Sequence, residues 1–284
     1  MKERAYAKIN LCLDVVKGRK DGYHDLRMIM VPIDFYDVLE MTRAEETSLR
    51  LNRSYLPVDE KNTVIKAISV LRDMYHFDSQ YACVLEKHIP TQAGLAGGSA
   101  DAAAAIRMLN RMEHLHMTRN DMVKAARSVG SDVPFCVLNQ PALVEGTGEV
   151  IEPFVCHPDF HVLLVKPKRG VSTALAFQKF DAVVSPVHPD VDGMRQALIN
   201  NDYAGILRCL GNSLEDVSMD LVPEIGAVRE QLKDLGFDGV LMSGSGSTVF
   251  GITQSRRLLN DACDTMRQRG YFTRMTRILA RSAV

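Results

Sequence analysis

A run of small residues near the middle of the chain has the composition of an anion-binding loop. It extends from Pro90 to Ala105 and passes from three glycines into an alanine-rich segment. Glycine lets the backbone approach a ligand closely, and alanine is the best helix former. We expect Ser99 to be the N-cap of that helix. Because a helix start has free N–H groups and a partial positive charge, the pattern favours a phosphate site over a simple packing turn.

This loop matches neither of two common phosphate-binding motifs. GxxxxGK[ST] needs a lysine directly after its last glycine, but Gly98 is followed by Ser99 and Ala100. The GxGxxG spacing is also missing. The positive charge that neutralises a bound phosphate must therefore come from elsewhere in the chain or from magnesium.

Two polar residues, Lys8 and Asn10, lie on a predicted strand near the N-terminus. The segment from Ala5 to Val16 alternates in polarity, which is typical of a half-buried strand. Lys8 and Asn10 are two residues apart, so their side chains point the same way. A lone lysine on such a face is more often solvated than functional, and that alternative stays open. Four apolar residues are expected together on the other face: Ile9, Leu11, Leu13 and Val15.

Four further segments hold candidate functional residues, each with an alternative. Tyr23 and His24 follow an Asp-Gly turn and could face a ligand or belong to a capped loop. Asp132 follows a predicted helix and is either a cap or a positioned base, the residues alone favouring the cap. Lys87, just before the glycine loop, could approach a nucleotide or be an exposed charge. The segment Ser243–Thr248 could close over a phosphate or form a plain turn.

The remaining pattern mixes strands and helices without regular βαβ alternation, which predicts an α+β fold. Loop-like composition near Pro153–Pro158 places a boundary between domains 1–155 and 156–284. The predicted strands are Arg27–Pro32, Asp37–Thr42, Ser48–Leu51, Tyr81–Leu85, His161–Lys166 and Arg274–Leu279. Besides the helix after the glycine loop, the predicted helices are Asn62–His76 with Asn62 as N-cap, Thr118–Gly130 opened by a capping box, Pro223–Leu235 and Ser255–Arg269.

Composition limits the classes of function. The 284 residues are 46% hydrophobic and 24% charged, with a net charge of -1, so there is no bulk basic field for nucleic acid. No apolar run reaches the ~20 residues of a membrane span, and the N-terminus lacks a signal-peptide core. Six scattered cysteines without a CxxC pair indicate reduced thiols, and we expect a cytoplasmic protein. No HExxH motif or Cys/His cluster argues for a structural metal.

Three motifs in order resemble the GHMP kinase superfamily. They are Ala7–Leu11 (AKINL), the loop Pro90–Ala100 and the segment Ser243–Thr248. Two more, Asp21–His24 (DGYH) and Gly130–Phe135 (GSDVPF), resemble those superfamily members that act on a cytidine-linked sugar alcohol. The resemblance covers nearly the whole chain. It is more specific than the glycine loop alone, which indicates only the superfamily.

The resemblance implies a fold and a reaction. The N-terminal half should look like ribosomal protein S5 domain 2, the C-terminal half should be ferredoxin-like, and the active site should lie in the cleft between them. The reaction would transfer the γ-phosphate of ATP to the 2-hydroxyl of a cytidine diphosphate-linked methylerythritol, a step of non-mevalonate isoprenoid synthesis. Magnesium would enter with ATP, held largely by phosphate oxygens and water, with no protein side chain identified as its ligand.

The resemblance also implies site residues. Asp132 would be the general base, and Lys8 would neutralise phosphate charge and hold that carboxylate ionised. Tyr23 would stack on the cytosine, His24 would hydrogen-bond its polar edge, and Phe177 would be the second side of the stack. Asn10 and the turn Gly244, Ser245 and Gly246 would also contact the substrate. The residues near ATP would be Asn62, Lys87, Pro90, Thr91, Gln92, Ala93, Gly94, Leu95, Ala96, Gly97, Gly98, Ser99 and Ala100.

Two departures and two alternatives remain. Ala93 and Ala96 stand where glycines can occur, which leaves phosphate binding intact unless those positions need positive φ. The chain could instead be a mevalonate or homoserine type of kinase, although such small acids offer Tyr23 no base to stack on. It could also be a non-catalytic nucleotide sensor, which the presence of both Lys8 and Asp132 disfavours. A monomer and a homodimer are both compatible with the sequence.

Overall fold

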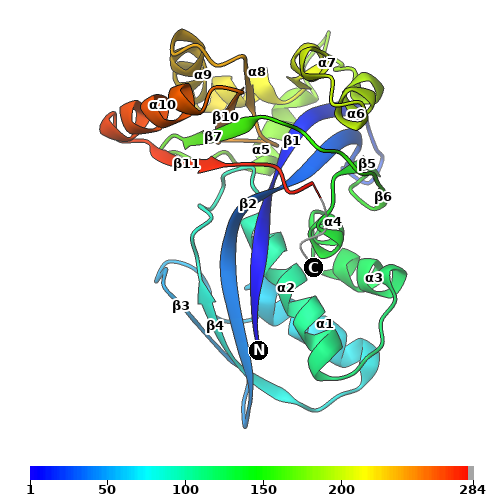
Figure 1. Cartoon of the computed structure of the whole chain (residues 1–284). Coiled ribbons are helices and arrows are strands. Elements are labelled where there is room, and N and C mark those ends of the chain that lie inside the picture. Colours follow the sequence, from blue (N-terminus) through cyan, green and yellow to red (C-terminus); the bar gives the residue numbers. More distant parts are fainter. Residues whose placement is uncertain (281–284) are drawn as a thin grey trace.

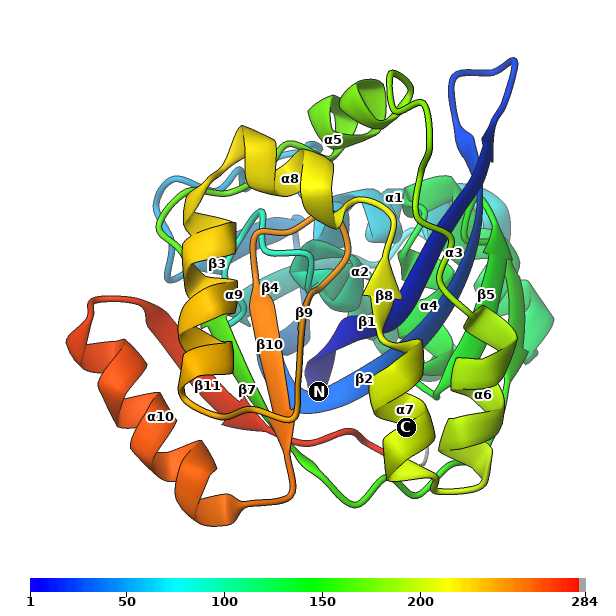
Figure 2. The same ribbon diagram turned by 90° about the horizontal axis from the view of Figure 1, so that it is seen from above.

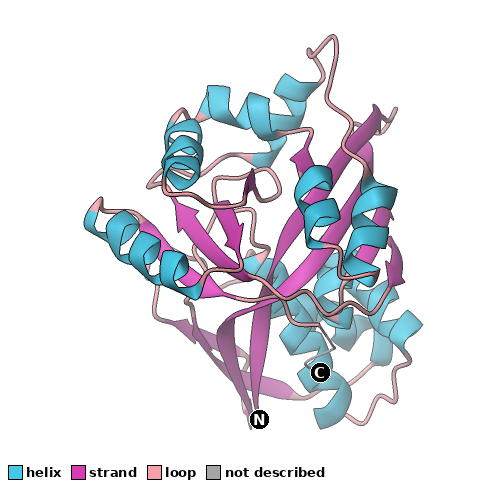
Figure 3. Ribbon diagram, turned by 45° about the horizontal axis from the view of Figure 1, so that its top comes forward, coloured by secondary structure: helices cyan, strands magenta, loops and turns pink. Residues whose placement is uncertain are grey.

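The structure, a computed structural model, describes residues 1–280 and is built on two β-sheets (Figures 1 and 3). The larger sheet has the order β3-β4-β2-β1-β8, with β5 paired to β2 and β6 paired to β5. Its strands are β1 (Lys2–Gly18), β2 (His24–Ala44), β3 (Ser48–Leu51), β4 (Gln80–Glu86), β5 (Ala142–Gly146), β6 (Val150–Pro153) and β8 (Gly211–Asn212).

Strand β2 joins two segments that the sequence predicts as separate strands. Arg27–Pro32 and Asp37–Thr42 are parts of one strand of 21 residues, and that prediction is wrong. One half of β2 pairs with β4 and the other half with β5. The long strand therefore connects the β3–β4 part of the sheet to the β5–β6 part. Pro32 lies beside a register shift between β1 and β2, where a strand tolerates a missing N–H group.

Strand β1 contains irregularities that change which face its side chains occupy. The register with β2 shifts between Tyr6 and Lys8 and again between Asn10 and Cys12. Because one extra residue reverses the alternation, the four apolar residues do not share one face, as the sequence predicted. They divide between two separate apolar clusters, Ile9 and Leu11 in one and Leu13 and Val15 in the other.

Helices from the N-terminal half cover one face of the larger sheet (Figure 1). They are α1 (Thr63–Tyr75), α2 (Gly97–Met112), α3 (Arg119–Val129) and α4 (Val133–Leu138). Helix α1 begins as predicted, with Asn62 Oδ1 accepting from Val64 N at 2.9 Å. The capping box predicted for α3 is also confirmed, with Thr118 and Asp121 bonded reciprocally.

The smaller sheet is antiparallel, with the order β11-β7-β10-β9 (Figure 2). In chain order this is fourth, first, third, second, which is the strand order of a ferredoxin-like domain. One face packs on helices and the other on β1 and β2, where Leu164 and Phe250 share an apolar cluster with Ile9. The elements are β7 (His161–Lys166), α5 (Thr173–Phe180), α6 (Val191–Ile199), α7 (Tyr203–Cys209), α8 (Glu215–Leu221), α9 (Glu224–Asp234), β9 (Gly239–Met242), β10 (Val249–Thr253), α10 (Arg256–Gln268) and β11 (Phe272–Thr276).

The two halves are tightly joined. The chain crosses from β6 to β7 between Pro153 and His161, around the predicted boundary. Farther along, however, β8 returns to the larger sheet and pairs in parallel with β1. The assignment of residues 1–155 and 156–284 to separate domains stays a prediction, because the halves share apolar clusters and one sheet.

The six cysteines are free thiols, all of them buried except the half-buried Cys209. Across residues 1–280, no helix combines the length and apolarity needed to cross a membrane.

Candidate active site

A cavity of about 930 Å³ lies where the glycine loop, the β1–β2 hairpin and the second half of the chain meet. Most of the candidate functional residues predicted from the sequence line this cavity. Those on its wall are Lys8, Asn10, Tyr23, His24, Lys87, the whole of Pro90–Ser99, Asp132, Phe177, Gly244, Ser245 and Gly246. Asn62 and Ala100 do not line it. The residues predicted from distant motifs thus converge on one site.

The carbonyl groups of the glycine loop face the protein. Leu95 O accepts from Lys8 N at 3.2 Å, and Gly94 O accepts from Ser243 Oγ at 3.0 Å. Ala93 O accepts from Thr248 N at 3.2 Å. Gln92 O accepts from Ser247 N at 3.4 Å. The loop is therefore fixed through its oxygens by β1 on one side and by the β9–β10 turn on the other.

The N–H groups of the same loop remain available. Within residues 1–280, no backbone N–H from Ala93 to Ser99 donates a hydrogen bond to the protein. These groups and the start of α2 supply the donors and partial positive charge that an anion needs. Ala100 is the first residue of this stretch whose N–H is bonded, to Ala96 O at 2.9 Å.

The helix after the loop begins earlier than the sequence predicts. Its N-cap is Ala96, with φ 56° and no side-chain cap bond, so the N-cap prediction for Ser99 is wrong. Ser99 lies within the first turn and lines the cavity. The left-handed conformation of Ala96 shows that this position does need positive φ, at a cost of about 1 kcal/mol for a residue other than glycine. Ala93 has no such requirement.

Lys8 and Asp132 meet beside the glycine loop. Lys8 Nζ lies 3.9 Å from Asp132 Oδ2 and donates to Asn10 Oδ1 at 2.7 Å. Lys8 is 4% exposed, which excludes the solvated-face alternative, whereas the Asp132 side chain is 38% exposed. Asp132 precedes α4 as its N-cap residue but makes no side-chain cap bond, so its carboxylate is free for another partner.

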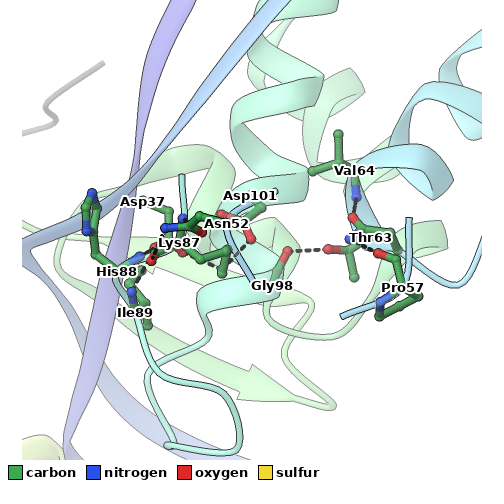
Figure 4. Close-up of polar contacts among 11 residues, drawn as sticks. Asp37, Asn52, Pro57, Thr63, Val64, Lys87, His88, Ile89, Gly98 and Asp101 are labelled. Atoms are coloured by element: carbon green, nitrogen blue, oxygen red, sulfur yellow. Dashed lines mark hydrogen bonds and ion pairs between the residues drawn. The ribbon is translucent and has the colours of Figure 1, made fainter. Parts of the chain in front are cut away.

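Lys87 lies under the loop in a cluster with two carboxylates (Figure 4). Its Nζ donates to Asp101 Oδ2 at 2.5 Å and also to Asp37 Oδ2. Asp37 Oδ1 accepts from the backbone N–H groups of His88 and Ile89. The cluster ties β2 to the residues just before the loop and to the first turns of α2. Lys87 is thus buried and paired, not an exposed charge.

Burial governs the protonation of this cluster. It raises the pKa of the Asp101 carboxyl to about 8, an effect that Lys87 only partly offsets. Burial alone would lower the pKa of Lys87, but the charges of Asp101 and Asp37 outweigh it and the pKa ends above its usual value. Asp101 Oδ1 is also buried without a hydrogen-bond partner among the described residues. Two carboxylates around one ammonium leave a surplus negative charge, which a proton on Asp101 would remove.

We expect this shift to be visible in the pH dependence of stability. A carboxyl whose pKa is raised in the folded state contributes stability that is complete below its unfolded pKa of about 3.8 and is lost as pH rises through about 8. The free energy of unfolding of the wild type, relative to Asp101→Asn, should therefore fall between about pH 4 and pH 8. Urea unfolding of both proteins across this range measures the difference. A difference that stays constant with pH would contradict the prediction.

Asn62 has a structural role in this structure. Its Oδ1 caps α1, and its Nδ2 donates to Pro57 O at 2.8 Å, so both ends of the amide are used. The neighbouring Thr63 lines the cavity and donates to Gly98 O at 2.7 Å (Figure 4). A contact between Asn62 and ATP stays a prediction, and Thr63 is the residue that reaches the loop from α1.

The aromatic residues are arranged differently from the expected pair of stacking partners. Tyr23 is 60% exposed at the cavity rim. His24 is buried, and its ring stacks directly on Phe177, with centroids 4.8 Å apart and planes 26° apart. The predicted roles of Tyr23 and Phe177 on two sides of a base stay predictions. One face of the Phe177 ring, however, is already covered by the His24 imidazole.

The turn between β9 and β10 is built into the cavity wall and is more than a plain β-turn. Asn212 Nδ2 donates to Gly244 O at 2.8 Å and to Met242 O at 2.9 Å. Ser245 Oγ lies 2.8 Å from Thr173 Oγ1 at the start of α5. The turn thereby connects the glycine loop, β8 and α5.

Several residues of the site escape prediction from the sequence. Asp37, Asp101 and Asn212 support the loops, and Asp181 contacts His24 at 2.7 Å. Asp101 carried one usable signal, a carboxylate within the alanine-rich first half of α2. The others lie in ordinary polar contexts, and only the fold shows what they touch.

The described part of the chain, residues 1–280, holds no preformed metal cage. Among residues 1–280, no group of three or more His, Cys, Asp or Glu side chains could hold a metal ion. Ser99 does line the cavity next to the free N–H groups. This donor set fits Mg²⁺, which usually binds through one or two protein ligands together with phosphates and water.

Family models match both halves of the chain. The model for GHMP kinases N terminal domain matches residues 62–140, and the model for GHMP kinases C terminal matches residues 194–271. Similar folds occur in a homoserine kinase from Cytophaga hutchinsonii, with a TM-score of 0.76 at 18% identity over 98% of this chain and 96% of that one. The two-domain fold that the resemblance implied is therefore confirmed.

More similar proteins narrow the family. The 4-diphosphocytidyl-2-C-methyl-D-erythritol kinase of Bacillus subtilis (strain 168) is 42% identical over 256 residues, which cover 89% of this chain and 88% of that protein. The same enzyme of Geobacillus sp. (strain WCH70) is 42% identical over 88% of this chain and 87% of its own. A crystal structure of 4-(cytidine 5'-diphospho)-2C-methyl-D-erythritol kinase has a TM-score of 0.81 at 30% identity and covers 97% of this chain and 99% of its own. The chain described here thus belongs to the 4-diphosphocytidyl-2-C-methyl-D-erythritol kinase family of the GHMP kinases.

Proposed function

We propose that this chain transfers the γ-phosphoryl group of ATP to the 2-hydroxyl of 4-diphosphocytidyl-2-C-methyl-D-erythritol, a step of isoprenoid precursor synthesis. The supporting observation is the 3.9 Å approach of Lys8 Nζ to Asp132 Oδ2 beside a loop with free N–H groups. Relatives of this name at 42% identity support the choice of substrate.

Each of the two residues has a defined task in this proposal. Phosphoryl transfer depends mainly on positioning and charge stabilisation. Asp132 accepts the proton of the attacking hydroxyl, because its carboxylate faces the cavity without a hydrogen-bond partner among the described residues. Lys8, held by Asn10, places an ammonium group next to Asp132 and the phosphates.

The glycine loop and the metal complete the charge stabilisation. The N–H groups from Ala93 to Ser99 donate to phosphate oxygens. Mg²⁺ arriving with ATP would be held by Ser99 together with phosphate oxygens and water, and it would neutralise phosphate charge.

The direct test uses purified protein, ATP and the cytidine-linked substrate, with the phosphorylated product identified by mass spectrometry. We expect ATP-dependent product from this substrate, and none from mevalonate or homoserine. Phosphorylation of mevalonate or homoserine instead would replace the proposal with another GHMP kinase activity. ATP binding without transfer to any of the three alcohols would indicate a nucleotide sensor.

Replacing Tyr23 with alanine should raise KM for the cytidine-linked substrate by about 5- to 150-fold, because stacking of a base on an aromatic ring contributes ~1–3 kcal/mol. KM for ATP should not change. Tyr23 is 60% exposed, so the replacement should leave folding intact. Tyr23→Phe, which keeps the ring, is the matched control. Steady-state kinetics of the three proteins measure the effect, and an unchanged KM in Tyr23→Ala would remove Tyr23 from the base site.

A further inference from the structure

His24 is held rigidly between the β1–β2 hairpin and helix α5. Its Nε2 lies 2.7 Å from Asp181 Oδ1. Its ring stacks on Phe177 and meets the edge of Phe180, with centroids 6.5 Å apart and planes at 81°. His24 is 8% exposed. The imidazole is therefore fixed by one polar and two aromatic contacts, which leaves it a single orientation.

The contact with Asp181 also determines which nitrogen of His24 carries the proton. An ionised carboxylate can only accept hydrogen bonds, so a neutral His24 must carry its proton on Nε2. The other nitrogen, Nδ1, is then an acceptor. Nδ1 has no hydrogen-bond partner within residues 1–280, and His24 lines the cavity beside Tyr23.

Helix stability does not explain the presence of Asp181. It is the C-cap residue of α5, where the macrodipole disfavours a carboxylate. Within the described residues, its side chain contacts only His24 as a charged or hydrogen-bonding partner, although 59% of it is exposed. The other end of α5 is tied down separately, by the Ser172 cap and by the contact of Thr173 with Ser245. The position of Asp181 is thus accounted for by His24 alone.

We propose that Asp181 is a positioning residue that fixes the tautomer of His24, so that Nδ1 accepts a hydrogen bond from the exocyclic amine of cytosine. This inference rests on the proposed function, which places cytidine in this part of the cavity. Uracil has a carbonyl group where cytosine has that amine. Two acceptors would then face each other, and the site would reject uridine nucleotides.

The first test reads the tautomer directly and needs no change in the protein. Nitrogen-15 NMR of the full chain, recorded at a pH where the ring is neutral, should show His24 protonated on Nε2. The signals are assigned by their loss in His24→Gln. In Asp181→Lys, where only a donor can face Nε2, the proton should move to Nδ1. A wild-type His24 protonated on Nδ1 would overturn the proposal.

The second test measures base selectivity without turnover. Calorimetry compares CDP with UDP while a non-hydrolysable ATP analogue fills the nucleotide site. We expect the wild type to prefer CDP. In Asp181→Leu the ratio of CDP affinity to UDP affinity should fall about tenfold, the equivalent of one hydrogen bond. Asp181→Asn keeps an acceptor oxygen and should retain most of the preference. Asp220→Leu removes the other ion pair of α5, with Lys179, and should change nothing.

The outcomes separate this inference from the proposed function. If Asp181 only holds α5 in place, Asp181→Leu weakens CDP and UDP equally and the preference is unchanged, which overturns the inference and leaves the kinase assignment standing. Binding of neither nucleotide by the wild type overturns the inference together with the cytidine substrate. A selective loss of CDP affinity, reversed in Asp181→Asn, supports it.

Discussion

Asp132→Asn should lower kcat by about 10²- to 10⁴-fold, the usual contribution of a general base, and leave the affinity for ATP unchanged. An amide cannot take the proton of the substrate hydroxyl, but it has nearly the same size as the carboxylate. Because Asp132 makes no side-chain hydrogen bond among the described residues and is 38% exposed, the substitution removes only the 3.9 Å ion pair with Lys8, which keeps its bond to Asn10. The loss should therefore appear in turnover and not in stability.

Single-turnover kinetics with the cytidine-linked substrate, together with calorimetric titration of ATP, distinguish the two effects. Asp73→Asn is the matched control, since it makes the same chemical change on an exposed position of α1. Near-normal turnover in Asp132→Asn would show that the proton goes elsewhere. Loss of ATP binding in that variant would assign Asp132 to the nucleotide or its metal instead.

Gly94→Ala should destabilise the protein by about 2–5 kcal/mol and abolish ATP binding. Gly94 has φ +72°, and a Cβ there would overlap the carbonyl oxygen of Ser243. The left-handed conformation and the close approach both exclude a side chain. The loop would have to move away from the β9–β10 turn, and the hydrogen bond from Ser243 Oγ to Gly94 O would be lost with it.

Gly98→Ala tests whether this effect is specific to Gly94. A Cβ on Gly98 would lie 3.5 Å from Thr63 Oγ1, an ordinary contact, and the residue is already helical. Urea unfolding and ATP titration of both variants should show a normal Gly98→Ala protein and an impaired Gly94→Ala protein. Equal behaviour of the two would mean that the loop has freedom that the structure does not show.

The sequence predicted the site better than it predicted the environment of each residue. Motif resemblance brought Lys8, Asp132 and the glycine loop together, and the structure places all of them on one cavity. Spacing alone, however, favoured a solvated Lys8 and a capping Asp132. Both local expectations failed because burial and partner choice depend on strands and helices that are distant in sequence.

The features that the sequence did not predict correctly have specific physical causes. The irregular register of β1 reversed a two-residue alternation, which no single-strand pattern can reveal. The N-cap was assigned to Ser99 because its hydroxyl suits that role, whereas the helix begins after an alanine in the left-handed region. The contact between His24 and Asp181 spans 157 positions of sequence and leaves no local signal.

The hydrogen bonds received by Gln92, Ala93 and Gly94 come from the region around the β9–β10 turn, far along the chain from the loop they hold. A truncated protein ending after β6 would retain the glycine loop Pro90–Ala100 and yet lack the β9–β10 turn that holds the loop in shape. Such a truncated protein should therefore regain affinity for a triphosphate when the missing half is added back as a separate fragment. An exchange of one half of the chain for that of another protein with this fold would have to preserve the contacts between the glycine loop and the β9–β10 turn.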